Sequence, residues 1–150
     1  MWNKDKSIIL TSCIIKAVYV MIAACCFAAP LMVRYYDDIQ LLQGGKSVFL
    51  PLLVTLYCVV PPALVALICL DQLLHNIKKG ELFVKKNVTL LRAISYGCFA
   101  VAVVLIYFAV LKPFAFVVVF AAAFVGLILR VVKNCFEQAV ALREENDFTI

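Results

Sequence analysis

Four long apolar segments constrain the fold of this chain more than any other feature. They cover residues 8–33, 48–70, 93–111 and 114–132. Each is close to the ~20 apolar residues that a helix needs to cross a hydrocarbon core ~30 Å thick. The chain is 66% hydrophobic, whereas a soluble domain is about 45–50% apolar. We therefore predict an all-α, polytopic membrane protein: a single domain of residues 1–150 with four transmembrane helices packed as a bundle.

Positive charge is unequally shared between the two sides that such a chain would have. Eleven of the fourteen Lys and Arg residues fall near the N-terminus, in the loop 71–92, or in and just before the tail 133–150. The other side holds Arg34, Lys46 and Lys112. Basic residues accumulate in short cytoplasmic loops. We predict that both termini, the loop and the tail are cytoplasmic, in the cytoplasmic membrane of a bacterium.

Several functional classes are disfavoured. The net charge of +5 does not indicate direct binding of nucleic acid, because the basic residues flank apolar segments and lack interleaved aromatic residues. Asp71 and His75 have i,i+4 spacing, but two ligands make no metal site. The seven cysteines lack Cys-x-x-Cys spacing and indicate small packing residues. With no nucleophile–base pair and no phosphate loop, we predict neither an enzyme nor a cofactor.

The first apolar segment contains two ambiguous features. Lys16 interrupts it, and its ammonium either reaches the inner interface along its aliphatic stem or serves a function inside the membrane. Cys25 ends an "IAAC" sequence that resembles a lipoprotein processing site, which leaves lipidation of Cys25 open. On the other side of the membrane, residues 34–47 are expected to form a short connection with an interfacial helix from Asp38 to Gln43, ended by a Gly-Gly pair.

The second apolar segment contains Pro61 and Pro62 near its middle. Two adjacent prolines remove internal hydrogen bonds, so a kink in this helix is expected. Broken helices mark binding sites in some transporters, but they are also tolerated where neighbouring helices satisfy the backbone. No Asp or Glu lies inside any predicted crossing, which disfavours an ion-coupled transporter.

The predicted inner face carries two amphipathic elements. Leucines and Ile77 follow helical spacing beyond residue 70, so the second helix is expected to continue to Lys78 and Lys79 and to end at Gly80. Phe83 is then expected to fold back onto apolar surface, and Asn87 to cap the next helix. The tail is also amphipathic: apolar residues, among them Phe136, lie on one face of the expected helix and polar residues on the other. The two elements could pack on each other, lie on lipid, or present a groove to a partner.

The loop "LLHNIKKGELFVKKNVTLLRAI" (73–94) and the terminal "ALREENDFTI" (141–150) carry a resemblance. The chain resembles an uncharacterised family of short four-helix membrane proteins, mostly from Gram-positive bacteria and often encoded beside a small helix-turn-helix regulator. That family has no established activity. The resemblance implies a motif that faces the cytoplasm and a soluble partner, with the regulator as one candidate.

Three functions remain open. The first is a non-enzymatic regulatory or scaffold protein that binds a cytosolic partner. Its candidate partner-binding residues are Lys78, Lys79, Gly80, Phe83, Asn87, Arg92, Phe136, Asn146 and Phe148. The second is a small transporter, channel or immunity-type protein with a site at the Pro61–Pro62 kink. The third is a structural subunit of a larger membrane complex, and a homo-oligomer is also compatible with the sequence.

Overall fold

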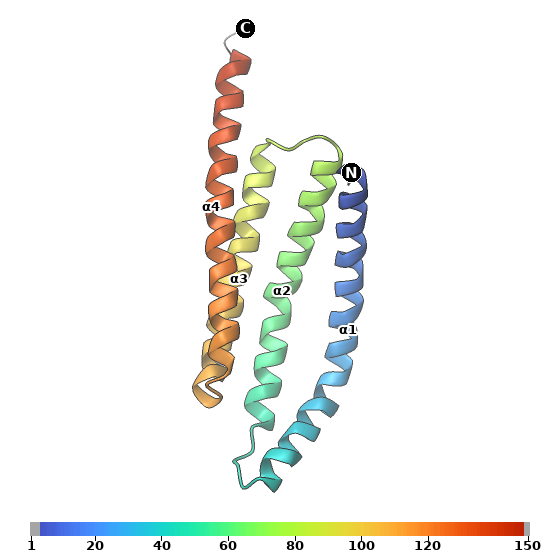
Figure 1. The fold of residues 1–150 in the computed structure, drawn as a ribbon, viewed down its shortest axis with the longest axis vertical. Coiled ribbons are helices and arrows are strands. Elements are labelled where there is room, and N and C mark those ends of the chain that lie inside the picture. Colours follow the sequence, from blue (N-terminus) through green and yellow to red (C-terminus); the bar gives the residue numbers. More distant parts are fainter. Residues whose placement is uncertain (1–3, 149–150) are drawn as a thin grey trace.

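The computed structural model describes residues 4–148, and it is helical throughout apart from short connections. The helices are α1 (Lys4–Leu42), α2 (Phe49–Lys78), α3 (Lys85–Leu111) and α4 (Ala115–Phe148) (Figure 1). All four are long and apolar enough to cross a membrane. The prediction of an all-α chain with four spanning helices is therefore confirmed. The two ends of the described chain lie at the same end of the molecule (Figure 1).

The four helices form an open row. Within residues 4–148, α1 packs on α2, α2 on α3 and α3 on α4, and no other pair of helices is in contact (Figure 1). This differs from the expected bundle. The accessible surface is 10472 Å², against about 7,600 Å² for a globular protein of this mass. Lipid tails are as apolar as leucine, so no hydrophobic force drives the row to close on itself.

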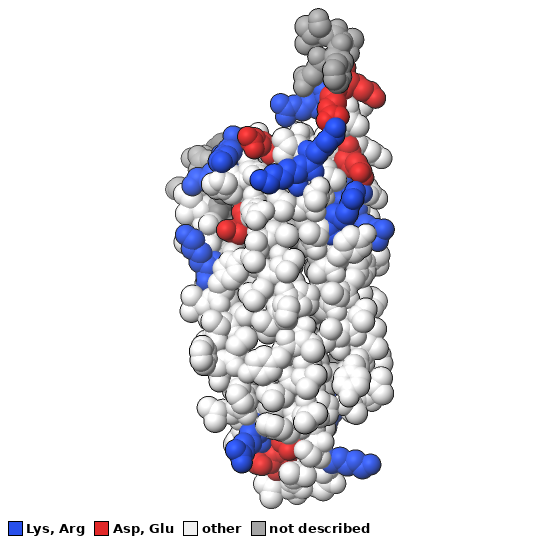
Figure 2. Space-filling model, turned by 180° about the vertical axis from the view of Figure 1, so that it is seen from behind, with Lys and Arg blue, Asp and Glu red and all other residues white. Residues whose placement is uncertain are grey.

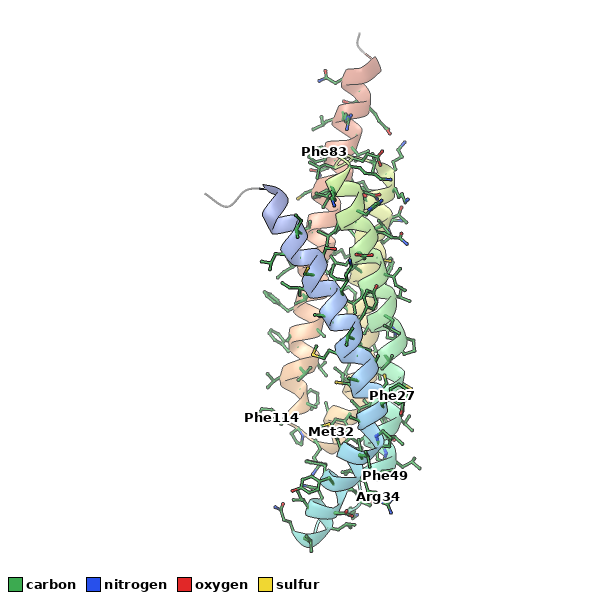
Figure 3. All side chains as sticks on the ribbon, turned by 90° about the vertical axis from the view of Figure 1, so that its right-hand side faces the viewer. Phe27, Met32, Arg34, Phe49, Phe83 and Phe114 are labelled. Carbon is green, nitrogen blue, oxygen red and sulfur yellow. The ribbon has the colours of Figure 1, made fainter. Side chains whose placement is uncertain are left out.

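Charge lies at the two ends of the row and leaves an uncharged belt between them. Figure 2 shows Lys, Arg, Asp and Glu gathered at both ends of one face, with other residues covering most of the middle. Large apolar side chains in this belt are strongly exposed, among them Phe27, Met32 and Phe114 (Figure 3). A water-soluble monomer rarely exposes so large an apolar surface. The belt has the character of a surface that faces lipid.

α1 is longer than the sequence predicted. The short connection expected over 34–47 is wrong, because α1 runs on to Leu42. It does so past Pro30 and bends in its light-blue lower part (Figure 1). The reason lies in Asp37, which is buried on this extension. Its carboxylate accepts hydrogen bonds from the Val48 amide at 2.6 Å and the Ser47 hydroxyl at 2.8 Å. The extension therefore places a carboxylate at the N-terminus of α2, where negative charge is favourable.

A glycine turn ends α1 as expected. Gly44 has a φ of 76°, in the left-handed region that glycine adopts without steric cost. The amide of Gly44 donates to the carbonyl of Leu41, and the amide of Gly45 donates to the carbonyl of Gln40. This pair of bonds is a Schellman motif. The prediction that Gly44-Gly45 ends a helix here is confirmed.

Small residues bring α3 close to both of its neighbours. A Cβ on Gly97 would lie 3.1 Å from the Ala66 side chain and 3.2 Å from the Pro62 carbonyl oxygen on α2. A Cβ on Gly126 of α4 would meet the Cys98 side chain at 3.3 Å. Close backbone approach of this kind is how helices associate in lipid. α2 itself continues as one helix through both of its central prolines.

Candidate functional site

Most candidate site residues lie at the end of the molecule that holds both ends of the described chain (Figure 1). Here α2 and α3 are joined by the loop 79–84. Gly80 has a φ of 83°, and its amide donates to the carbonyl of Ile77, while the Glu81 amide donates to the carbonyl of Asn76. This is a second Schellman motif. The predictions that α2 continues to the lysine pair and ends at Gly80 are confirmed.

Asn87 does not cap α3, so that prediction is wrong. Val84 occupies the N-cap position, and no side chain bonds the first amides of α3. Asn87 is fully buried, with a relative exposure of 0%. Its Nδ2 donates to the carbonyls of Glu81 and Leu82 at 2.7 and 2.8 Å, and its Oδ1 accepts from Asn76 Nδ2 at 2.7 Å. Asn87 therefore holds the loop to the end of α2.

The chemistry of the amide explains this placement. The carbonyls of Glu81 and Leu82 are partly buried, and a carbonyl shielded from water without a donor is costly. Asparagine supplies two donors and one acceptor on a short side chain, which matches two carbonyls and the Asn76 amide. A capping serine or aspartate would offer too few donors. Spacing along the sequence gave no sign of this pair, because the two asparagines belong to different helices.

The loop packs against α4 through two aromatic rings. The ring centroids of Phe83 and Phe136 lie 5.7 Å apart, with a tilted geometry. Phe136 also packs against a cluster of buried residues that joins α2 to α3, formed by Leu73, Leu90, Leu91 and Ile94. Phe83 therefore does fold back onto apolar surface. Of the arrangements left open for the inner-face elements, the structure contains the one in which they pack on each other.

Ion pairs connect α3 with the part of α4 beyond its apolar segment. Lys85 pairs with Glu144 at 2.9 Å, and Arg92 lies 3.6 Å from Glu137. Lys133 also pairs with Glu137, and its hydrogen bond holds the pKa of that carboxyl below its usual value. These carboxylates are about half exposed, so the pairs contribute little to stability. Their geometric effect is to fix the rotation of α4 relative to α3.

The structure thus divides the candidate partner-binding residues into two groups. Phe83, Asn87, Arg92 and Phe136 all contact other parts of the same chain. Exposed candidates are Lys78, Lys79, Gly80 and Asn146. Phe148 ends α4, and its side chain lies outside the described residues. Phe83 and Arg92 stay partly exposed, and the lysine pair and the last turns of α4, which project beyond the loop (Figure 1), add further exposed surface.

A polar cavity opens between α1 and α2 at the same end. Its volume is about 590 Å³. Its polar and charged lining comprises Ser12, Lys16, Asp71, Gln72, His75, Asn76, Lys78 and Lys86. Lys16, which interrupts the first apolar segment, therefore borders a polar space between helices. Asp71 and His75 share one helix face by their i,i+4 spacing, but nothing in the sequence indicated that Lys16 lines the same cavity.

An apolar groove lies between the same two helices, farther along their axes from this end. Its volume is about 320 Å³, and its lining includes Cys25, Cys26 and Tyr57. The Tyr57 hydroxyl donates to the Cys26 carbonyl at 3.1 Å. Neither Pro61 nor Pro62 lines the groove. Cys25 is an exposed free thiol on α1.

The fold and the lengths of the four helices are those of a multi-pass membrane protein. Comparison with protein families adds an assignment. Residues 14–150 match the family described as "Protein of unknown function (DUF2975)", and the chain belongs to it. No curated protein and no solved structure matches the chain.

Proposed function

We propose that this protein is a non-enzymatic regulatory or scaffold protein that holds a cytosolic protein at the bacterial membrane. The observation that carries the proposal is the part of α4 that follows its apolar segment. It extends past the α2–α3 loop as a continuous helix (Figure 1). A helix that served only to cross the bilayer would end near the interface, at about 20 residues, whereas α4 has 34.

Orientation supports a cytosolic partner. The end with the two termini carries eleven of the fourteen basic residues. Basic residues accumulate in the short loops on the cytoplasmic side of a membrane. On this reading the lysine pair at 78 and 79 and the projecting helix both face the cytosol. The opposite end offers short connections, and some of its polar groups bond within the chain, such as Asp37 and Lys112.

Charge suggests what kind of partner fits. The last turns of α4, residues 141–148, contain three acidic residues and one arginine. An acidic helix tip attracts a basic surface and speeds its approach. DNA-binding proteins carry basic surfaces, so the helix-turn-helix regulator implied by the family resemblance is the first partner to test. Packing against the loop holds α4 in one orientation, which lowers the ordering cost of binding.

Membrane orientation is the first test. Single cysteines at Lys46, Gly80 and Asn146, all exposed positions, would be introduced into a variant without the seven native cysteines. A membrane-impermeant thiol reagent applied to intact cells is expected to label position 46 alone. Labelling at 80 or 146 would contradict the proposed orientation and exclude a cytosolic partner at this end.

The partner itself is tested by site-specific photo-crosslinking in cells. A photoreactive residue at Asn146 is expected to give a discrete crosslinked product with a cytosolic protein, and the same residue at Lys46 is not. Glu145→Lys should reduce that product if the acidic helix tip is the contact. Equal products from both positions, or none from 146, would count against the proposal.

A transport function has weaker support. The four helices stand in a row, and a row encloses no pathway within one copy (Figure 1). Replacing both central prolines with alanine is the direct test of the alternative site. Unchanged flux or resistance in that variant would eliminate the version of transport that depends on the kink.

A further inference from the structure

The cavity between α1 and α2 is a concave site whose lining, apart from Lys78, has no role in the proposed function. Its volume of about 590 Å³ falls within the roughly 300–1,000 Å³ of small-molecule sites. Three helices contribute to it: Lys16 comes from α1, Lys78 from α2 and Lys86 from α3. Lysines from three different helices therefore line one space.

Positive charge in this cavity exceeds negative charge. Three lysines border it, against one carboxylate, that of Asp71. The ion pairs seen among the described residues use Lys85, Arg92 and Lys133, none of which lines the cavity. Among the side chains that the structure describes, no carboxylate forms an ion pair with a cavity lysine. Like charges placed around a low-dielectric wall attract an anion and repel one another without it.

The position of Lys16 needs an explanation beyond membrane topology. Topology requires basic residues near helix ends, but Lys16 lies about 18 Å along α1 from Lys4, at 1.5 Å per residue. Basic residues inside an apolar segment are costly and usually face a polar space or a partner. Here the space is the cavity, and the apolar residues Ile9 and Leu74 form part of its wall.

The remaining lining groups define what the anion carries. Ser12 and Gln72 offer hydrogen-bond donors as well as acceptors, and Asp71 accepts. Lysine is a common ligand of phosphate as a point charge. An accepting carboxylate beside the lysines fits a hydroxyl group attached to the anion, because a hydroxyl can donate to it. An inorganic anion without a proton, such as sulfate, would offer Asp71 no donor.

We propose that this cavity binds a phosphate group that carries a hydroxylated substituent, such as glycerol phosphate. Two sources supply this chemistry: the headgroup of an anionic phospholipid, and a soluble phosphorylated polyol. The site does not depend on the cytosolic partner proposed above or on which side of the membrane the cavity faces.

The test uses the full-length protein in nanodiscs of phosphatidylcholine, which has a neutral headgroup. In one arm, native mass spectrometry measures binding of added phosphatidylglycerol. In the other, isothermal titration calorimetry measures binding of glycerol 3-phosphate, with inorganic phosphate as a second probe. Saturable binding in the first arm alone assigns the site to lipid, and in the second arm to a soluble ligand.

Matched variants decide whether binding belongs to the cavity. Lys16→Gln and Lys78→Gln each remove one lining charge and are expected to weaken binding about tenfold, as for the loss of one charged hydrogen bond. Lys79→Gln removes the same charge one residue away, from a side chain that does not line the cavity, and should change binding less than twofold.

Two results would overturn the proposal. One is the absence of saturable binding of both phosphatidylglycerol and glycerol 3-phosphate to the wild-type protein. The other is equal weakening by Lys78→Gln and Lys79→Gln, which would show attraction to the whole basic end. If Lys16→Gln lowers the unfolding temperature, Lys86→Gln replaces it, because Lys86 is exposed in the first turn of α3.

Discussion

α1 and α4 are the two edges of the helix row, and they are attached in different ways. α4 lies against α3 with Gly126 in close contact with Cys98. The buried Ser95 hydroxyl donates to the Gly126 carbonyl at 2.8 Å. α1 is longer, at 39 residues, but the hydrogen bond near the middle of its contact with α2 is longer and exposed, from Tyr57 to Cys26 at 3.1 Å.

Cavity sizes follow the same division. Spaces of about 590 and 320 Å³ border α1, while those between α3 and α4 measure about 270 and 40 Å³. α1 is fixed instead at its far end, where Asp37 bonds the start of α2 and the Lys112 ammonium donates to Gln40. A tightly packed edge suits a helix that is held rigidly and contacts a partner protein. A loosely packed edge leaves room for a ligand.

The largest expected effect is loss of the buried amide that holds the α2–α3 loop under α4. Asn87→Ala leaves two carbonyls and the Asn76 amide without partners, and each unpaired buried group costs about 1–3 kcal/mol. We expect the free energy of unfolding to fall by about 3 kcal/mol, allowing for relaxation. Reversible unfolding in mixed micelles, followed by circular dichroism, measures it.

The control for this variant is Thr89→Ala. Thr89 is exposed on the same helix, and its hydroxyl makes one long bond, 3.3 Å, to a backbone carbonyl. Surface substitutions of this kind usually change stability by less than about 0.5 kcal/mol. Equal effects at 87 and 89 would contradict the role given to Asn87.

Next in size is the close packing of the α4 edge. A Cβ added to Gly126 would lie 3.3 Å from the Cys98 side chain and from the Phe99 ring. The methyl groups of Gly126→Val therefore crowd both neighbours. Overpacking of a close contact costs about 1–3 kcal/mol, so we expect a loss of about 2 kcal/mol. Ala121→Val introduces the same side chain on the exposed side of α4 and is the control. A similar loss at both positions would mean that Gly126 is not the close contact that holds α4 to α3.

A smaller effect is expected at the anchored end of α1. Asp37→Ala removes the acceptor of the Val48 amide and the Ser47 hydroxyl. Loss of a hydrogen bond to a charged group costs about 1.5–3 kcal/mol, and we expect a loss near the lower end of that range. Asp38→Ala, at the exposed neighbouring position, should have little effect. Unfolding that responds equally to both variants would remove Asp37 as the anchor of α1.

The smallest effects compare one interhelical hydrogen bond at each edge. Such bonds contribute about 0.6 kcal/mol on average in a membrane protein. Ser95→Ala should lose about that amount, because its bond is short and buried. Tyr57→Phe should lose less, because its bond is long and exposed. A larger loss for Tyr57→Phe would reverse the comparison and make α1 the tighter edge.

The sequence determined the features that depend on local pattern. Four apolar segments of spanning length predicted the four helices, since composition and length alone decide whether a helix can cross a bilayer. Gly44 and Gly80 end helices as predicted, because only glycine adopts a positive φ there without steric cost. The amphipathic continuation of α2 to Lys78 follows from helical spacing.

The tertiary structure decided everything that depends on residues distant in sequence. Asp37 bonds Val48 only because α1 continues past the predicted boundary, and Asn87 meets Asn76 only because two helices return side by side. Lys16 of α1 and Asp71 of α2 likewise line one cavity only because the two helices lie side by side. Periodicity reports which face of a helix is apolar, not which helix will cover it, and in lipid an apolar face can remain uncovered. For that reason the sequence predicted four helices, and only their packing decided that they stand in an open row.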